Sequence, residues 1–148
     1  MATFRLEIVT AESEVFSGDV EMLVAPGREG QLGILPNHAP LLTQLAPGEI
    51  DIRANGEEIS MAVGGGFLEV LANKVVILAD TAERADEIDL DRAEAAMKRA
   101  EERVASRGAD VDMERALQTV ARSRVRLAVA RRRRRQAPPA SSAPGSPG

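Results

Sequence analysis

The sequence predicts an α+β chain: an N-terminal antiparallel β-sandwich of about ten strands, followed by a C-terminal antiparallel two-helix hairpin. Two observations support this prediction. Apolar and polar residues alternate in short runs over residues 1–87, which is typical of strands with one buried face. From residue 88 the apolar residues recur at steps of three and four, which is typical of a helix. We therefore expect a sandwich at 1–87, a hairpin at 88–135 and a disordered tail at 136–148.

Turn residues separate the expected strands. Alternation is clear at residues 4–9 and 49–53, and Ala54-Asn55-Gly56 follows the second run as a turn. Residues 72–74, Ala-Asn-Lys, lie between two further apolar runs and indicate a hairpin. Ser17-Gly18 is also expected to form a turn. Many short strands with Gly and Pro between them favour a sandwich or a flattened barrel.

Each expected helix has a narrow, Ala-rich apolar stripe. Asp89 or Asp91 can cap the start of the first helix, Gly108 ends it, and Asp110 or Asp112 can cap the second. A hairpin that buries so little area is expected to be only marginally stable alone. The stripe of the first helix is Leu90, Ala93, Met97, Ala100 and Val104, and that of the second is Met113, Leu117, Val120, Ala121, Val125 and Ala128.

Composition excludes several classes of protein. The 148 residues include no Cys, so disulfides and thiolate metal sites are excluded. The absence of Trp and Tyr argues against an aromatic platform for single-stranded nucleic acid. No apolar run approaches the roughly 20 residues that span a bilayer. Because the start also lacks the pattern of a signal peptide, we expect a cytoplasmic protein without a transmembrane segment.

The residues offer no catalytic constellation. The sequence contains neither a G-x-x-x-x-G-K-[ST] phosphate loop nor a G-x-S-x-G nucleophile motif. Its single histidine, His38, lies between Pro36 and Pro40 without the Cys or carboxylate partners of a zinc site. A hydrogen-bonded structural role is favoured for it over service to a catalytic serine. We therefore expect a non-catalytic protein with no catalytic residues and no metal.

Charge is divided unevenly along the chain. Residues 1–87 carry 5 basic and 15 acidic side chains, whereas residues 88–148 carry 14 basic and 8 acidic ones. Nine arginines and no acid lie between Arg115 and Arg135. The two parts are therefore expected to meet different partners. The run 131–135 fits a solvated helix end, an acidic protein surface, nucleic acid or anionic lipid, and the run alone does not choose among them.

Four arginines are expected to share one flank of the hairpin. Folding the chain back around residues 108–110 places Arg92 opposite Arg126 and Arg99 opposite Arg122. Within each helix the two arginines are seven or four residues apart and share a face. Guanidinium groups gathered in this way suit a polyanion, because their planar forks match phosphate oxygens. Four solvated side chains on an exposed face remain the alternative.

Residues 30–42, Gly-Gln-Leu-Gly-Ile-Leu-Pro-Asn-His-Ala-Pro-Leu-Leu, resemble the signature loop of the epsilon subunit of F-type ATP synthases. The resemblance continues at 65–70 and 76–79 and extends to about residue 135. It implies a ten-stranded sandwich at the base of the central stalk, docked on the gamma subunit and on the ring of membrane c subunits. It also implies a mobile hairpin that either lies against the sandwich or extends toward the catalytic head and inhibits ATP hydrolysis.

The resemblance further implies where the partners bind. The contact loop for the c ring and gamma would comprise Gly30, Gln31, Leu32, Pro36 and His38. The family often has Glu at the position of Gln31, so here the contact would rest on hydrogen bonds. The basic second helix would complement an acidic surface of the catalytic beta subunits. The chain would then be a non-catalytic rotor and regulatory subunit, peripheral on the cytoplasmic side of the cell membrane.

In some bacterial members of this family the folded hairpin binds ATP through an I/L-D-x-x-R-A motif, which residues 88–93 match completely. By this resemblance the arginines would hold the phosphates, Glu83 and Asp89 would meet the adenine and ribose, and no metal would be required. Acids along the first helix would weaken anion binding. The implied site for ATP as a regulatory ligand comprises Glu83, Ile88, Asp89, Arg92, Ala93, Arg99, Arg122 and Arg126.

A small nucleic-acid-binding protein that uses residues 115–135 is the alternative function. The acidic first part and the scarcity of aromatic residues argue against it.

Overall fold

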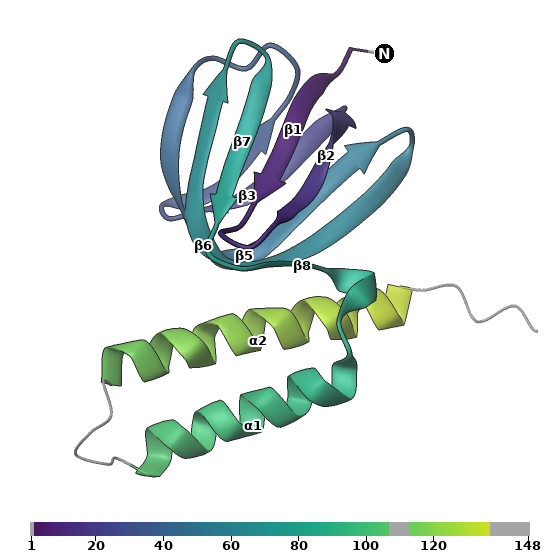
Figure 1. The fold of residues 1–148 in the computed structure, drawn as a ribbon. Helices are drawn as coiled ribbons and strands as arrows, with labels where there is room; N and C mark the ends of the chain where they lie inside the picture. Colours follow the sequence, from purple (N-terminus) through teal and green to yellow (C-terminus); the bar gives the residue numbers. More distant parts are fainter. Residues whose placement is uncertain (1, 107–112, 137–148) are drawn as a thin grey trace, which may run out of the picture.

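The computed structural model of the chain describes residues 2–106 and 113–136, so the expected caps at 108–112 and residues 137–148 of the expected tail lie outside them. The described residues form a β-sandwich followed by two antiparallel helices (Figure 1), which confirms the predicted fold class. The elements are β1 (Phe4–Val9), β2 (Glu14–Val20), β3 (Met22–Gly27), β4 (Gly30–Ile34), β5 (Leu41–Ala54), β6 (Glu57–Leu71), β7 (Lys74–Ala79), β8 (Ala82–Arg84), the 3-10 helix η1 (Ala85–Glu87), α1 (Leu90–Ser106) and α2 (Met113–Gln136).

Two long strands join the layers of the sandwich. β5 and β6 pair along their whole length and curve from one layer into the other (Figure 1). β7 and β1 continue the layer that holds the end of β6, and β3 and β4 continue the layer that holds the end of β5. The strand order is β2-β1-β7-β6-β5-β3-β4, with β8 paired to β6. The described chain thus has eight continuous strands where about ten were expected, because β5 and β6 each serve both layers.

Glycines make the bend in β6. Gly65 and Gly66 have φ angles of +110° and +138°, in the region that favours glycine. The pairing with β6 continues past the end of β7, because Gly64 N donates to Thr81 O and Asp80 N donates to Gly65 O, both at 2.9 Å. β8 therefore extends β7 around the corner. This extension presents residues 80–84 to the helices.

Local turn chemistry behaves as predicted at two hairpins. Asn55 and Gly56 both have positive φ, as do Ala72 and Asn73, and each pair forms a two-residue connection between paired strands. The turn expected at Ser17-Gly18 is wrong. Both residues lie inside β2, where small side chains are tolerated and the backbone pairs with β1.

The core between the layers consists of fully buried side chains such as Leu6, Ile8, Leu23, Ile50, Ile52, Leu68 and Ile77.

The helices are stacked, so that α2 lies between α1 and the sandwich (Figure 1). Asp89 caps α1, since its Oδ1 accepts a hydrogen bond from Arg92 N at 3.1 Å. The stripe predicted for α1 is confirmed at Ala93, Met97 and Ala100, which are buried.

The stripe predicted for α2 is confirmed at Val120 and Val125, which are half-buried against the helix core. It is wrong at three other positions, because α2 buries two faces rather than one. Met113 and Leu117 are exposed, by 39% and 52%, and Ala128 is also exposed. A single-stripe prediction assumes one packing partner, whereas α2 contacts α1 on one side and β5, β6 and η1 on the other. The buried residues are Ala116, Leu127, Val129 and Ala130.

Candidate ligand site between α2 and the sandwich

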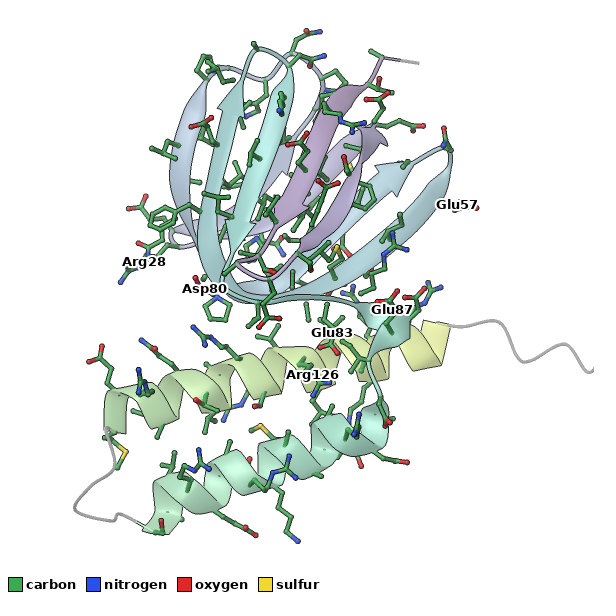
Figure 2. All side chains as sticks on the ribbon, viewed as in Figure 1. Arg28, Glu57, Asp80, Glu83, Glu87 and Arg126 are labelled. Atoms are coloured by element: carbon green, nitrogen blue, oxygen red, sulfur yellow. The ribbon has the colours of Figure 1, made fainter. Side chains whose placement is uncertain are left out.

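A cavity of about 450 Å³ lies where α2 crosses the corner of the sandwich. Arg122 and Arg126 enter it from α2, four residues apart and therefore on one face of the helix. Glu83 enters from β8, and Figure 2 shows it close to Arg126. Thr81 and Ser123 add hydroxyl groups to the lining, and Gly64 of β6 adds backbone.

Arg126 and Glu83 form a paired contact across this cavity. Arg126 Nε donates to Glu83 Oε2 at 2.6 Å, and Nη2 donates to Oε1 at 3.0 Å. Their side chains are 30% and 34% exposed. The hydrogen bond to Glu83, together with the negative charges of Glu83 and Asp89, raises the pKa of Arg126 above its usual value, although partial burial acts in the opposite direction. The guanidinium is therefore a permanent positive charge in the cavity.

Arg122 makes a looser set of contacts. Its Nε donates to Gly64 O at 3.2 Å, and its Nη2 lies 3.6 Å from Asp80 Oδ2. A Cβ at Gly64 would overlap Thr81 Oγ1 and would come within 3.1 Å of Arg122 Cδ. The missing side chain at Gly64 thus lets α2 approach the bend of β6.

Other residues of the expected ATP site lie outside this cavity. Ile88 and Asp89 line a neighbouring cavity of about 450 Å³ with Arg133, and Ala93 is buried at 1% exposure in the helix contact. Arg92 and Arg99 are exposed on α1, and neither is among the described residues that line the first cavity.

The register between the helices explains this placement. Arg131 Nη2 lies 3.4 Å from Glu94 Oε1, which shifts the facing positions by about one helical turn from the predicted register. Arg122 and Arg126 are turned toward acids of the sandwich instead of toward Arg92 and Arg99. The predicted facing pairs of arginines are therefore not formed.

The expected contact loop begins in β4 and continues past its end. Asn37, at a φ of +64°, donates its backbone N–H to Asn73 Oδ1 at 2.8 Å, which ties the loop to the β6–β7 turn. His38 is half-buried, and its Nδ1 donates to the neighbouring Ala39 O at 2.7 Å, in keeping with a structural role. Gly30 and Gln31 are exposed, whereas Leu32 and Pro36 are half-buried.

Sequence reasoning missed an exposed apolar stripe on the outside of the sandwich. Phe67 of β6 is paired with Leu78 of β7, and these side chains are 52% and 58% exposed. Leu42 and Leu71 extend the stripe, at 70% and 57% exposure. A signal was present, because residues 67–71 contain apolar residues in both phases of the strand period. A strand of that kind is expected to be covered on both faces.

None of the described helices is long and apolar enough to cross a membrane. Over residues 2–106 and 113–136, no three His, Cys, Asp or Glu side chains are grouped so that they could hold a metal ion.

Comparison with known proteins gives consistent results along the chain. The model of the ATP synthase delta/epsilon chain β-sandwich domain matches residues 3–85, and the model of the long α-helix domain of the same chain matches residues 86–131. The ATP synthase epsilon chain of Herpetosiphon aurantiacus is 54% identical over 130 residues, covering 88% of this chain and 96% of the relative. That of Dehalococcoides mccartyi strain CBDB1 is 51% identical over 138 residues, covering 91% and 97%.

A solved structure shares the fold at low identity. A chain in the mitochondrial ATP synthase of Euglena gracilis, in a structure that contains OSCP, F1 and the c ring, superimposes with a TM-score of 0.70. It is 22% identical, and the match covers 82% of this chain and 77% of that one. The family models cover nearly all of the described residues, so this chain belongs to the ATP synthase delta/epsilon chain family.

Proposed function

We propose that the chain is a non-catalytic rotor subunit of an F-type ATP synthase, peripheral on the cytoplasmic side of the cell membrane. Its sandwich would join the gamma subunit to the c ring, and its hairpin would inhibit ATP hydrolysis by reaching the beta subunits. Family membership over both domains supports this proposal. The similar solved chain belongs to a Euglena gracilis assembly that contains OSCP, F1 and the c ring, which is in keeping with this proposal.

The outer face of the sandwich supports a role in docking. Leu42, Phe67 and Leu78 are each more than half exposed on neighbouring strands. Exposed apolar side chains grouped in this way on one face are typical of a protein interface, since their burial is favourable and their exposure is costly. We propose that gamma covers this stripe and that the loop around Gln31 contacts the c ring through hydrogen bonds.

The cavity supports regulation by ATP. The observation that carries the proposal is that Arg122 and Arg126 converge with Glu83 in a single 450 Å³ space between α2 and the sandwich. Phosphate oxygens would compete with Asp80 and Glu83 for these guanidinium groups. Because such a ligand bridges two parts that separate when the hairpin extends, it would stabilise the folded hairpin only.

Arg92 and Arg99 would join the site from α1. Both are exposed on α1, so a bound phosphate chain would draw them in by side-chain movement or by a small shift of α1. The negative charge of Asp89 contributes to the raised pKa of Arg126, which supports a site that includes the start of the motif. ATP would then relieve inhibition by holding α1 and α2 against the sandwich.

Truncation tests the inhibitory role. In an ATP synthase assembled with this chain truncated after Glu87, every residue of the sandwich is kept and both α1 and α2 are lost. We expect assembly and proton coupling to persist while ATP hydrolysis rises. Unchanged hydrolysis in a correctly assembled complex would show that the hairpin does not inhibit.

A further inference from the structure

Three consecutive arginines near the end of α2, at positions 131–133, face three different elements. Neighbours on a helix point about 100° apart, so a run of arginines cannot serve a single surface. Arg131 pairs with Glu94 of α1 at 3.4 Å, and Arg132 pairs with Glu49 and Asp51 of β5. Arg133 lines a cavity together with Asp86 of η1. The structure therefore gives Arg131 and Arg132 ion-pair partners within the same chain.

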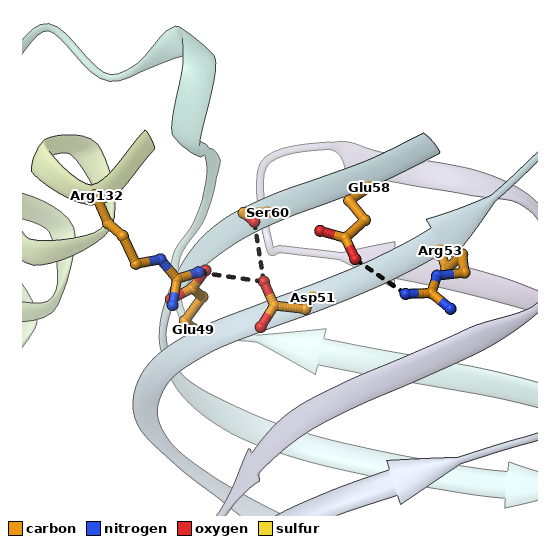
Figure 3. Close-up of polar contacts among 6 residues, drawn as sticks. All are labelled: Glu49, Asp51, Arg53, Glu58, Ser60 and Arg132. Atoms are coloured by element: carbon orange, nitrogen blue, oxygen red, sulfur yellow. Dashed lines mark hydrogen bonds and ion pairs between the residues drawn. The ribbon is translucent and has the colours of Figure 1, made fainter. Parts of the chain in front are cut away.

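Arg132 makes the contact with the sandwich. Its Nη2 contacts Glu49 Oε1 directly and lies 3.5 Å from Asp51 Oδ1 (Figure 3). Asp51 is held in place by Ser60, whose hydroxyl donates to Oδ1 at 2.9 Å. Two carboxylates from alternate positions of one strand, which share a face, thus meet a single guanidinium.

Glu49 depends on this guanidinium. Its side chain is only 18% exposed, and its Oε1 is buried without a hydrogen bond from the other described residues. Taking a carboxylate out of water is unfavourable unless a countercharge compensates it. With α2 in place Arg132 supplies that charge, whereas with α2 removed Glu49 would return to water. Removal of Arg132 should therefore penalise the docked hairpin more than the undocked one.

We propose that Arg132, Glu49 and Asp51 form an electrostatic latch that holds the hairpin against the sandwich without any nucleotide. None of the three lines the cavity that contains Arg122 and Arg126. The latch and a ligand in that cavity would therefore contribute separately to docking. The proposal rests on the proposed function only in taking the docked hairpin as the non-inhibitory state.

This latch sets the ratio of docked to undocked hairpin that a ligand would then shift. If the docked state already dominates, little ligand free energy is needed to complete the shift, and weakening the latch raises the ligand concentration that is required. Because the latch is an ion pair at a partly exposed surface, it should weaken as salt screens its charges.

Distances between paired spin labels can test the latch in the full chain. The chain contains no Cys, so Glu29→Cys in the sandwich and Leu117→Cys on α2 give two unique labels at exposed positions. Without nucleotide, we expect a short distance to dominate in the parent chain. Arg132→Gln should raise the ratio of long to short distances about tenfold at low salt.

Charge rescue separates the latch from packing. Adding Glu49→Gln and Asp51→Asn to Arg132→Gln removes the uncompensated carboxylates, and the ratio should fall again by at least threefold. Arg53→Gln is the matched control, because Arg53 pairs with Glu58 at 3.1 Å within the β5–β6 hairpin, away from the helices (Figure 3). It should leave the ratio unchanged.

Several results would overturn the latch. A parent chain that is already mostly undocked, an Arg132→Gln variant that matches Arg53→Gln, or a rescue variant that matches Arg132→Gln would each do so. Circular dichroism of every variant confirms that the sandwich stays folded. Because no nucleotide is present, a failure of ATP binding would not change these outcomes, and a failed latch would leave ATP binding open to its own test.

Discussion

Arg126 of α2 donates two hydrogen bonds, of 2.6 and 3.0 Å, to the carboxylate of Glu83 in β8, across the boundary between the hairpin and the sandwich. The two residues are 43 positions apart in sequence. Their contact needs both the extension of β7 into β8 and the placement of α2 next to the sheet. It therefore reports directly on whether the hairpin is docked.

Removing either partner should loosen α2. We expect Arg126→Ala and Glu83→Gln each to lower the opening free energy of α2, with a coupling of about 1 kcal/mol in the double-mutant cycle, because both side chains are about one-third exposed. Amide hydrogen exchange of α2 measures this quantity. A coupling near zero would mean that the pair does not hold the hairpin.

Raising the pH to 9 should not remove the positive charge of Arg126, so the ion pair with Glu83 should persist. The pKa of Arg126 is raised above its usual value, so its stabilising charge is complete below the unfolded pKa and is lost only at still higher pH. The coupling measured by hydrogen exchange should therefore be the same at pH 7 and pH 9. A steep loss over this interval would contradict the assignment of a charged Arg126.

Asp89 should act first as a helix cap. Its Oδ1 accepts the Arg92 N–H, so Asp89→Ala should cost the start of α1 about 1 kcal/mol, whereas Asp89→Asn should keep most of the cap. Hydrogen exchange in the first turn of α1 distinguishes these variants. If Asp89→Asn also lowers the effect of ATP on α2, the charge of Asp89 has a second role at the ligand site.

Gly64 should be intolerant of a side chain, unlike Gly33. A Cβ at Gly64 would overlap Thr81 Oγ1 and crowd Arg122, whereas a Cβ at Gly33 would meet no atom within 4 Å. We expect Gly64→Ala to displace α2 and to speed hydrogen exchange there, with partial recovery on adding Thr81→Ala. Gly33→Ala should leave exchange of α2 unchanged. Equal effects of the two alanines would argue against close approach at Gly64.

Phe67 should matter for assembly and little for folding. Because its side chain is 52% exposed, Phe67→Ser should change the free energy of unfolding by at most about 0.5 kcal/mol. Co-purification with the gamma subunit should nevertheless fall sharply, while the exposed control Glu57→Ser retains it. Normal co-purification of Phe67→Ser would exclude this stripe from the interface.

The parts of the fold that depend on neighbouring residues were predictable from sequence. Asn55-Gly56 specifies its turn through positive φ angles, and Asp89 specifies the start of α1 through its side chain. The continuity of β6 was not predictable in this way. The glycines at 64–66 interrupt the apolar pattern as a turn would, but here they bend a strand whose pairing with β5 is continuous. Local composition does not distinguish these two uses of glycine.

The arginine arrangement needed tertiary information. The spacing of Arg122 and Arg126 correctly places them on one face, but their partners, Asp80 and Glu83, come from the sandwich. Which face of α2 meets α1 depends on how the whole hairpin is seated, and the sequence does not encode this in any single stripe. The expected pairing with Arg92 and Arg99 failed for that reason.

Calorimetric titration of the isolated chain with ATP tests the central claim most directly. We expect saturable binding by the parent chain, a loss of at least about tenfold in affinity for Arg122→Ala and for Arg126→Ala, and no change for Arg103→Ala on the exposed side of α1. Absence of binding by the parent chain at millimolar ATP, or unchanged affinity in both cavity variants, would contradict the claim that this cavity is an ATP site.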